Sequence, residues 1–257
     1  MKSLFWQTTG SGNQDLVLLH GWGLNAEVWS CIISRLSPHF RVHMIDLPGY
    51  GRSSGYGALT LPQMAEEVSL RAPNNALWLG WSLGGLIATQ AALQQPDAMR
   101  GLITVASSPR FCAEGHWPGI RLKLLDDLAK QLNEDFFSTV CRFFDVQTLG
   151  NEFARQDARW LKSVVLGQPM PSKTVLASGW EMIQNSDLRP TLCKLNVPML
   201  RLYGYLDALV PRKVIPHVDA LCPTSRSVIF HAAAHAPFIS HPDRFCQVLN
   251  EFSQYLS

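Results

Sequence analysis

The sequence contains little charge. Asp, Glu, Lys and Arg make up 16% of its 257 residues, and the formal net charge is only +2. Such a small positive excess gives no electrostatic reason to expect a nucleic-acid partner. No apolar run approaches the length of a membrane-spanning helix, and residues 1–7 lack the sustained apolar segment of a secretory signal. We therefore expect no nucleic acid, no membrane and no export.

The cysteines lack a pattern as well. No Cys-x-x-Cys pair occurs among the six, which stand at positions 31, 112, 141, 193, 222 and 246. Disulfide frameworks and zinc sites both depend on characteristic cysteine spacings. We expect free, buried thiols in a reducing cytoplasm, no metal, no cofactor and a monomeric chain.

Apolar residues, by contrast, are plentiful at 47%, and they fall in short runs that alternate with helical stretches. The runs that are typical of strands buried on both faces cover residues 16–20, 42–46, 76–81, 102–106, 199–203 and 227–230. Helical patterns follow Thr60 and Ser82, and a last helix starts near Pro242. This alternation predicts an α/β fold with a mostly parallel, doubly wound sheet.

The sequence pattern changes between residues 111 and 186, where the apolar residues recur at helical spacing throughout. Apolar and polar side chains share one helix face at positions 136, 140, 143, 144 and 147. We expect one discontinuous core domain, residues 1–110 and 187–257, with residues 111–186 inserted as an all-helical lid over the sheet.

A Gly-x-Ser-x-Gly sequence, Gly80-Trp81-Ser82-Leu83-Gly84, joins the predicted strand 76–81 to the helix after it. In a nucleophile elbow the serine sits on a strained strand-to-helix turn, so its hydroxyl projects above the sheet. The alternative is a glycine-rich turn that exposes a serine by accident. Ser82 is the candidate nucleophile.

A nucleophilic serine needs a base, and the base needs an acid to orient it, in the chain order Ser, acid, His. Asp207 is the preferred acid because it follows the strand 199–203, where the edge of the sheet would present it. Asp187 precedes that strand and Asp219 lies in a helical stretch. The alternative role of Asp207 is a turn or cap residue.

Three histidines follow the last predicted strand. His231 stands at its end, and His241 precedes Pro242 at a helix start. His235 lies in the loop between them, from which a side chain can turn back to Ser82. We take His235 as the base and the other two as surface or capping residues.

The tetrahedral intermediate of such a hydrolase also needs two backbone N–H donors. Leu83, directly after the nucleophile, supplies one, and Trp22 in the loop His20-Gly21-Trp22-Gly23 fits the other. That loop lacks the third glycine and the lysine of phosphate-binding motifs. His20 itself is expected to hold structure by hydrogen bonds.

These segments together resemble the α/β-hydrolase family over nearly the whole chain. The matching segments are 20–23, 46–53 (Asp-Leu-Pro-Gly-Tyr-Gly-Arg-Ser), 80–85, 204–207 and the loop of His235. The commoner elbow of that superfamily has His before the serine, whereas this chain has Trp81. In having Trp81 there, and in residues 20–29 and 107–109, the chain resembles the biotin-synthesis carboxylesterases. These enzymes hydrolyse the methyl ester of pimeloyl-acyl carrier protein.

The resemblance implies a serine esterase with a Ser82–Asp207–His235 triad, no cofactor, and an acyl carrier protein bearing a methyl-esterified chain as partner. It implies oxyanion donors at Trp22 and Leu83. The substrate contacts that it implies are Trp22, Ser82, Leu83, Phe143, Phe144, Gln147 and His235.

Basic residues on the predicted lid, Arg142, Arg155, Arg159 and Lys162, could form a stripe that steers an acidic carrier protein. The alternative is an ordinary solvated face, because acidic residues lie in the same segment. Other functions stay open: a broad short-chain esterase or thioesterase, a cofactor-free haloperoxidase or C–C bond hydrolase, and a hydrolase-fold binding module with little turnover.

Overall fold

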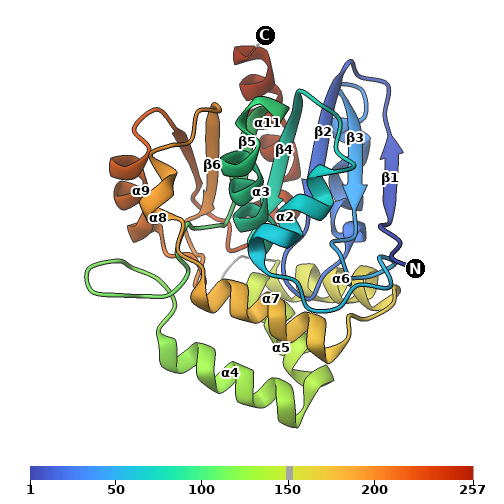
Figure 1. The fold of residues 1–257 in the computed structure, drawn as a ribbon, viewed down its shortest axis with the longest axis vertical. Coiled ribbons are helices and arrows are strands. Elements are labelled where there is room, and N and C mark those ends of the chain that lie inside the picture. The colour runs from blue at the N-terminus through green and yellow to red at the C-terminus, as the bar shows by residue number, and fades with distance from the viewer. Residues whose placement is uncertain (149–152, 257) are drawn as a thin grey trace.

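The computed structural model describes residues 1–148 and 153–256 (Figure 1). Within them, seven strands form one sheet in the order β1-β3-β2-β4-β5-β6-β7. Only β1 runs antiparallel to its neighbour. The strands are β1 (Trp6–Thr9), β2 (Gln14–Leu19), β3 (Phe40–Ile45), β4 (Ala76–Trp81), β5 (Met99–Val105), β6 (Met199–Gly204) and β7 (Arg226–Phe230). The predicted α/β class with a mostly parallel sheet is confirmed.

The six strands that the sequence predicts are all present, and β4 has the predicted bounds. β1 was not predicted. Its four residues, Trp6–Thr9, are exposed or half-buried, so they show no apolar run. Pairing with β3 at the edge of the sheet, from Trp6 opposite Ile45 to Thr9 opposite Val42, makes this segment a strand.

Helices cover both faces of the sheet and one of its edges. They are α1 (Ser30–Leu36), α2 (Leu61–Ser69), α3 (Leu83–Gln94), α4 (Leu122–Glu134), α5 (Phe136–Thr148), α6 (Ala154–Leu166), α7 (Lys173–Asn185), α8 (Arg189–Leu192), α9 (Ile215–Leu221), α10 (Pro237–Ser240) and α11 (Pro242–Tyr255), with short 3₁₀ helices at Ala26–Trp29, Pro96–Ala98 and Arg212–Val214. In the part of the chain described, no helix is both long and apolar enough to cross a bilayer.

Local sequence explains where several of these helices begin. Thr60 caps α2: its hydroxyl accepts the N–H of Gln63, and the side chain of Gln63 accepts the N–H of Thr60. This reciprocal pair is the capping box that the sequence predicts. Likewise, α11 starts at Pro242, with His241 as its N-cap.

The core surrounds β4 and α3. All six residues of β4 are buried, and α3 is buried along most of its length. α2 packs beside α3 on one face of the sheet, and α11 lies on the other face (Figure 1), with α1 packed beside it. Burial on both faces explains why the central strands read as continuous apolar runs.

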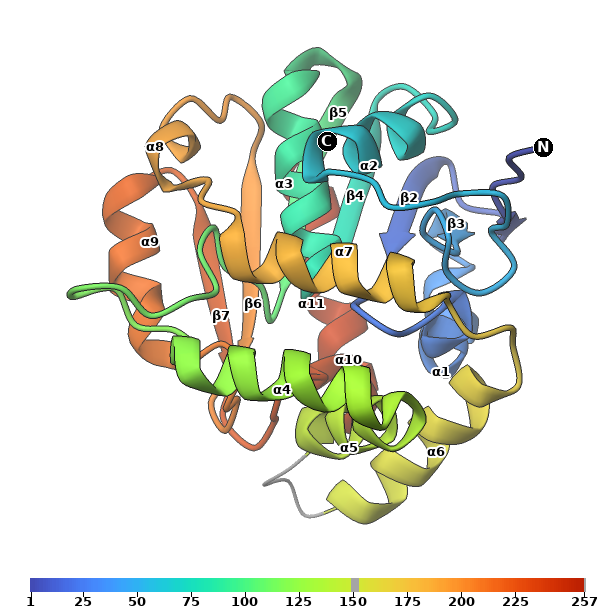
Figure 2. The ribbon, with the colours of Figure 1, turned by 60° about the horizontal axis from the view of Figure 1, so that its bottom comes forward.

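The helices α4, α5, α6 and α7 lie across the edge of the sheet at which the parallel strands end (Figure 2). Between β5 and β6 the described residues form helices and add no strand to the sheet. The boundaries of a separate lid, residues 111–186, stay a prediction. The placement of these four helices covers the edge where doubly wound folds bind ligands.

Candidate active site

Ser82 occupies the turn between β4 and α3 with φ 56° and ψ −117°. A residue that carries a side chain rarely adopts such a positive φ, and strain of this kind concentrates at functional sites. Two hydrogen bonds from the β5 side support the turn: Ser82 N–H donates to Val105 O at 2.9 Å, and Ser107 Oγ donates to Ser82 O at 2.8 Å. The conformation is that of a nucleophile elbow.

Close backbone contacts explain why residues 80 and 84 of the elbow are glycines. A Cβ on Gly80 would lie 2.5 Å from the nitrogen of Gly85, and a Cβ on Gly84 would lie 2.6 Å from the carbonyl oxygen of His20. The start of α3 therefore packs directly on the backbone of β4 and on the end of β2. Larger residues at either position would push the serine out of place.

Asp207 and His235 meet near the end of β4, where the ring centroid of His235 lies 5.9 Å from that of Trp81, the residue before Ser82. The Nδ1 of His235 is 2.8 Å from Oδ2 of Asp207, and both side chains are almost completely buried. Asp207 lies just after β6, and His235 lies in the loop after β7. The structure thus brings the predicted acid and base together, although they are 28 residues apart.

The competing residues have other partners. Asp187 forms an ion pair with Arg189 at 2.7 Å, and Asp219 forms one with Arg201. His231 is exposed, and His241 forms a 2.8 Å hydrogen bond with Ser240.

The second ring nitrogen of His235, Nε2, is buried and has no hydrogen-bond partner in the described part of the chain. Because Nδ1 donates to the carboxylate, Nε2 is the nitrogen with a free lone pair. Contacts between a base and its nucleophile are often loose in structures without substrate. The geometry leaves Nε2 available to take a proton.

The backbone of His235 is fixed on both sides. Its N–H donates to the carbonyl oxygen of Gln147 in α5 at 3.0 Å, and its carbonyl accepts the indole N–H of Trp81 at 2.8 Å. The sequence indicated Trp81 only as a feature of the subfamily. Nothing in a single sequence points to a contact between residues 154 positions apart.

The loop after β2 lies against the elbow. A Cβ on Gly21 would lie 3.3 Å from Cβ of Ser82, so Trp22 follows a backbone in contact with the nucleophile. Leu83 is the first residue of α3, whose N–H has no acceptor within the helix. Both predicted donors are therefore near Ser82.

His20 holds this loop as a neutral imidazole. Its Nδ1–H donates to Gly21 O at 2.8 Å, and its Nε2 accepts the N–H of Leu47 at 2.9 Å. Burial lowers the pKa of His20 to about 4. These contacts agree with the structural role expected for it.

Asp46, directly after β3, stabilises the segment that follows β2. Its fully buried carboxylate accepts the N–H of Ala26 at 2.7 Å and binds the guanidinium of Arg52 at 2.7 Å. Burial raises the pKa of this carboxyl, but the Arg52 hydrogen bond, the nearby His20 and the backbone donors together hold it below its ordinary value. Asp46 is thus a charged structural anchor.

The predicted substrate-contact residues of α5 are buried beneath the helices. The ring of Phe143 contacts that of Trp22 edge-on, with centroids 5.1 Å apart, and Phe144 and Gln147 are buried. Both amide atoms of Gln147 lack a partner among the described residues. The side chain of residue 136, expected on this face, lies outside what the structure describes.

Helices α6 and α7 are joined to the segment after β2. The indole N–H of Trp22 donates to Leu176 O at 2.8 Å, and the amide of Asn25 donates to Val165 O at 3.0 Å. The hydroxyl of Tyr50 is buried near Gly179 and has no partner in the residues described. This hydroxyl is not among the site residues predicted from the sequence.

The basic residues expected to dock a carrier are not equivalent. Arg142, Arg155 and Arg159 are exposed, whereas Lys162 forms a 2.6 Å ion pair with Asp145. The charge of Lys162 is therefore already matched within the protein.

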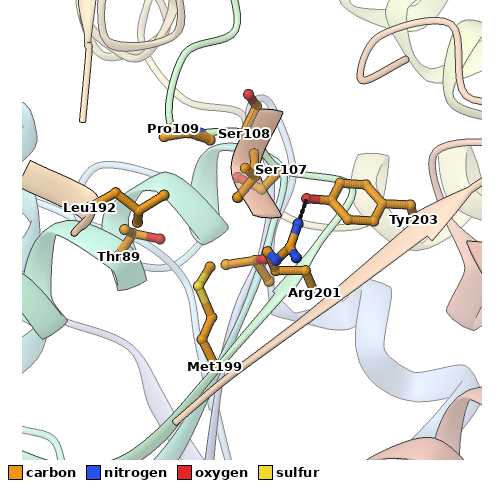
Figure 3. Close-up of a pocket in the computed structure, with 10 residues that line it drawn as sticks. Thr89, Ser107, Ser108, Pro109, Leu192, Met199, Arg201 and Tyr203 are labelled. Atoms are coloured by element: carbon orange, nitrogen blue, oxygen red, sulfur yellow. Dashed lines mark hydrogen bonds between the residues drawn. The ribbon is translucent and has the colours of Figure 1, made fainter. Parts of the chain in front are cut away.

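Behind the elbow lies a small cavity between α3, β5 and β6 that polar and apolar side chains line together (Figure 3). Ser107 lines it, and Arg201 in the same wall bonds to the hydroxyl of Tyr203 at 3.3 Å. Its volume of about 10 Å³ is that of a single water-sized sphere. It is too small for an acyl substrate. In residues 1–148 and 153–256, no three His, Cys, Asp or Glu side chains gather as metal ligands would.

The fold, the elbow and the buried Asp–His pair define the chain as an α/β hydrolase. A profile of the α/β-hydrolase fold family matches residues 16–242, and the chain belongs to that family. The resemblance seen in the sequence is confirmed.

Two curated relatives are named pimeloyl-[acyl-carrier protein] methyl ester esterase. The one from Sodalis glossinidius is 65% identical over 254 residues, which are 99% of each chain. The one from Serratia marcescens is 62% identical over 252 residues, which are 98% of each chain. A solved esterase from Exiguobacterium antarcticum aligns with a TM-score of 0.87 over 99% of this chain and 96% of its own, and at 24% identity this likeness shows the fold alone.

Proposed function

We propose that the chain is a serine carboxylesterase that hydrolyses the methyl ester of pimeloyl-acyl carrier protein to pimeloyl-acyl carrier protein and methanol, a step of biotin synthesis. The assignment of the substrate rests on the 65% identity, over 99% of both chains, to a relative with that name. The chemistry is supported by the buried Asp207–His235 pair beside the strained Ser82.

In the first half of the reaction, Oγ of Ser82 attacks the ester carbonyl carbon while Nε2 of His235 takes its proton. The N–H groups of Trp22 and Leu83 stabilise the oxyanion that forms. When the intermediate collapses, the C–O bond to methanol breaks and His235 returns the proton to the leaving oxygen. Asp207 stays ionised and keeps the proton of the imidazole on Nδ1.

In the second half, a water molecule attacks the acyl-enzyme and gives a proton to His235. The bond to Ser82 then breaks, His235 reprotonates Oγ, and the acyl chain leaves as a free carboxylate still bound to its carrier. Phe143, Phe144 and Gln147 would contact the chain. The unpartnered amide of Gln147 can bond to a polar group of the substrate.

Labelling of Ser82 tests the chemistry. We expect an organophosphonate to label the wild-type protein covalently and to leave Ser82→Ala unlabelled. Absence of labelling of the wild type would favour a hydrolase-fold binding module and end the enzyme proposal. Restoration of growth in a strain that cannot make pimelate, by the wild type and not by Ser82→Ala, would support the pathway assignment.

The carrier protein is proposed to dock on the exposed arginines of α5 and α6, Arg142, Arg155 and Arg159. Acyl carrier proteins are acidic, and an exposed basic surface raises the rate of encounter with an acidic partner. Lys162 would contribute less, because Asp145 already pairs with it.

A charge-reversal experiment tests the docking. Arg155→Glu/Arg159→Glu should lower kcat/KM for the carrier-bound ester at least tenfold and leave that for free methyl pimelate unchanged. The matched control is Lys194→Glu/Arg226→Glu, two exposed basic residues just before β6 and at the start of β7, at the opposite edge of the sheet. Equal kcat/KM on the free and the carrier-bound ester would instead favour a broad short-chain esterase.

We also propose that the protein is a cytoplasmic monomer. All six cysteines are free, as suits a reducing compartment. The proposed triad and both donors come from one chain, so no second copy is needed to complete the site. Sedimentation of the purified protein checks the monomer, and cell fractionation checks the compartment.

A further inference from the structure

We propose that Trp81 is a positioning residue, whose indole N–H holds His235 in register with Ser82. This inference rests on the proposed function, because it takes His235 as the base. Trp81 is the last residue of β4 and directly precedes Ser82. Its Nε1–H donates to the carbonyl oxygen of His235 at 2.8 Å. The residue next to the nucleophile in sequence is thus bonded to the base.

The indole is itself held rigidly. Trp81 is completely buried, and its ring packs edge-on against Phe238, with centroids 4.8 Å apart, and against Trp29, with centroids 6.3 Å apart. Phe238 belongs to α10, the short helix that follows the loop of His235. Both the donor and the segment that carries the acceptor are therefore fixed in one packed cluster.

Three hydrogen bonds locate His235. Nδ1 is bonded to Asp207 at 2.8 Å, the backbone N–H to Gln147 at 3.0 Å, and the carbonyl to Trp81 at 2.8 Å. The first orients the ring, and the other two fix the backbone from which the ring extends. Of these three bonds, the one from Trp81 connects that backbone to the strand that carries the nucleophile.

Burial alone does not require this bond. The indoles of Trp29 and Trp78 are also buried, and their N–H groups have no partner in the part of the chain described. The fold therefore tolerates unpartnered indoles close by. The hydrogen bond from Trp81 to His235 is better explained if it serves to position His235.

The test compares Trp81→Phe with Trp29→Phe, using p-nitrophenyl acetate as a small ester. A misplacement of about 1 Å at a reacting group costs about 100-fold in rate. Trp81→Phe should therefore lower kcat by about 10- to 100-fold and change KM less than about threefold. Trp29→Phe removes the same atoms from the same cluster without removing a hydrogen bond, and its kcat should change no more than about twofold.

A spectroscopic measurement separates positioning from packing. The proton shared by His235 and Asp207 should give a sharp downfield NMR signal in the wild type and in Trp29→Phe. In Trp81→Phe that signal should broaden or disappear. Equal losses of kcat in the two variants, with the signal kept in both, would overturn the proposal.

If Trp81→Phe does not fold, 3-benzothienylalanine at position 81 replaces only the N–H by sulfur and keeps the shape of the ring. A kcat equal to that of the wild type would then overturn the proposal. Ser82→Ala and His235→Ala separate the two levels of inference. If either keeps wild-type activity, the proposed function fails; if both are inactive and Trp81→Phe matches Trp29→Phe, only the role of Trp81 fails.

Discussion

Asp207 divides its two carboxylate oxygens between His235 and the backbone. Oδ2 accepts Nδ1–H of His235 at 2.8 Å, and Oδ1 accepts the N–H groups of Leu209 at 2.8 Å and Val210 at 3.0 Å. The turn after β6 thus holds the carboxylate by bonds that do not involve the imidazole. A preset acceptor of this kind selects one tautomer of the histidine.

Asp207→Asn should lower kcat by about 10³- to 10⁴-fold, because an amide N–H facing Nδ1 stabilises the wrong tautomer. Steady-state hydrolysis of p-nitrophenyl acetate measures the loss. The matched control is Asp187→Asn, which changes the competing carboxylate paired with Arg189. Its kcat should stay within about twofold of the wild type, and a large loss there would contradict the assignment of Asp207.

Gly204→Ala should displace the loop that carries His235. A Cβ at this position would overlap the carbonyl oxygen of Ala234 and come within 2.6 Å of that of Ala233. We expect a loss of about 2–4 kcal/mol in the free energy of unfolding, and a fall in kcat. Gly57→Ala is the control, because nothing lies within 4 Å of its Cβ. Urea denaturation of the two variants should therefore give clearly different midpoints.

Acid should destabilise the protein through His20. Burial lowers the pKa of its imidazole in the folded state to about 4, whereas in the unfolded state it titrates near 6.5. As the pH falls, the unfolded state thus takes up the proton first. The contribution of neutral, buried His20 to the free energy of unfolding is therefore complete above pH 6.5, and it is lost as the pH falls from about 6.5 to about 4. The loss amounts to about 3 kcal/mol.

The measurement is the free energy of unfolding at several pH values for the wild type and for His20→Gln, which cannot titrate. The difference between the two should shrink as the pH falls below 6.5, since only the wild type loses this contribution. A difference that stays constant to pH 4.5 would show that His20 is not the group responsible.

The ion pair of Arg201 with Asp219 should respond asymmetrically to mutation. The Arg201 side chain is 1% exposed, whereas that of Asp219 is 51% exposed. Asp219→Ala leaves a buried cation without its carboxylate and should cost about 1–3 kcal/mol of the free energy of unfolding, since the Asp219 side of the pair is open to water and Arg201 keeps its bonds to Ser225 and Tyr203. Arg201→Met leaves a carboxylate that water can solvate, so its cost should be smaller. Chemical denaturation of both variants tests the order, and equal costs would contradict it.

The sheet and the proposed triad could be predicted because their signals are local. Runs that are apolar on both faces mark parallel strands, and Ser82, Asp207 and His235 each follow a strand in the order that the fold requires. Thr60 and Gln63 gave the start of α2 for the same reason, since a capping box needs only four consecutive residues.

The features that the sequence did not reveal are contacts between distant segments. β1 becomes a strand only by pairing with β3, and Trp81 meets His235 across 154 positions. The Lys162–Asp145 ion pair likewise joins two helices whose relative placement no periodicity encodes. Local patterns specify elements, whereas tertiary packing decides which side chains of those elements meet.

The hydrogen bond from Trp22 to Leu176 connects a residue of the proposed oxyanion hole to the helix α7. The backbone of Trp22 is a proposed oxyanion donor, while its side chain is bonded to α7 across the top of the site. Because Leu176 lies in α7, a displacement of α7 away from the sheet would break that bond. The position of α7 and that of a proposed oxyanion donor are therefore coupled, so a change in how α7 packs would be felt in the stabilisation of the oxyanion.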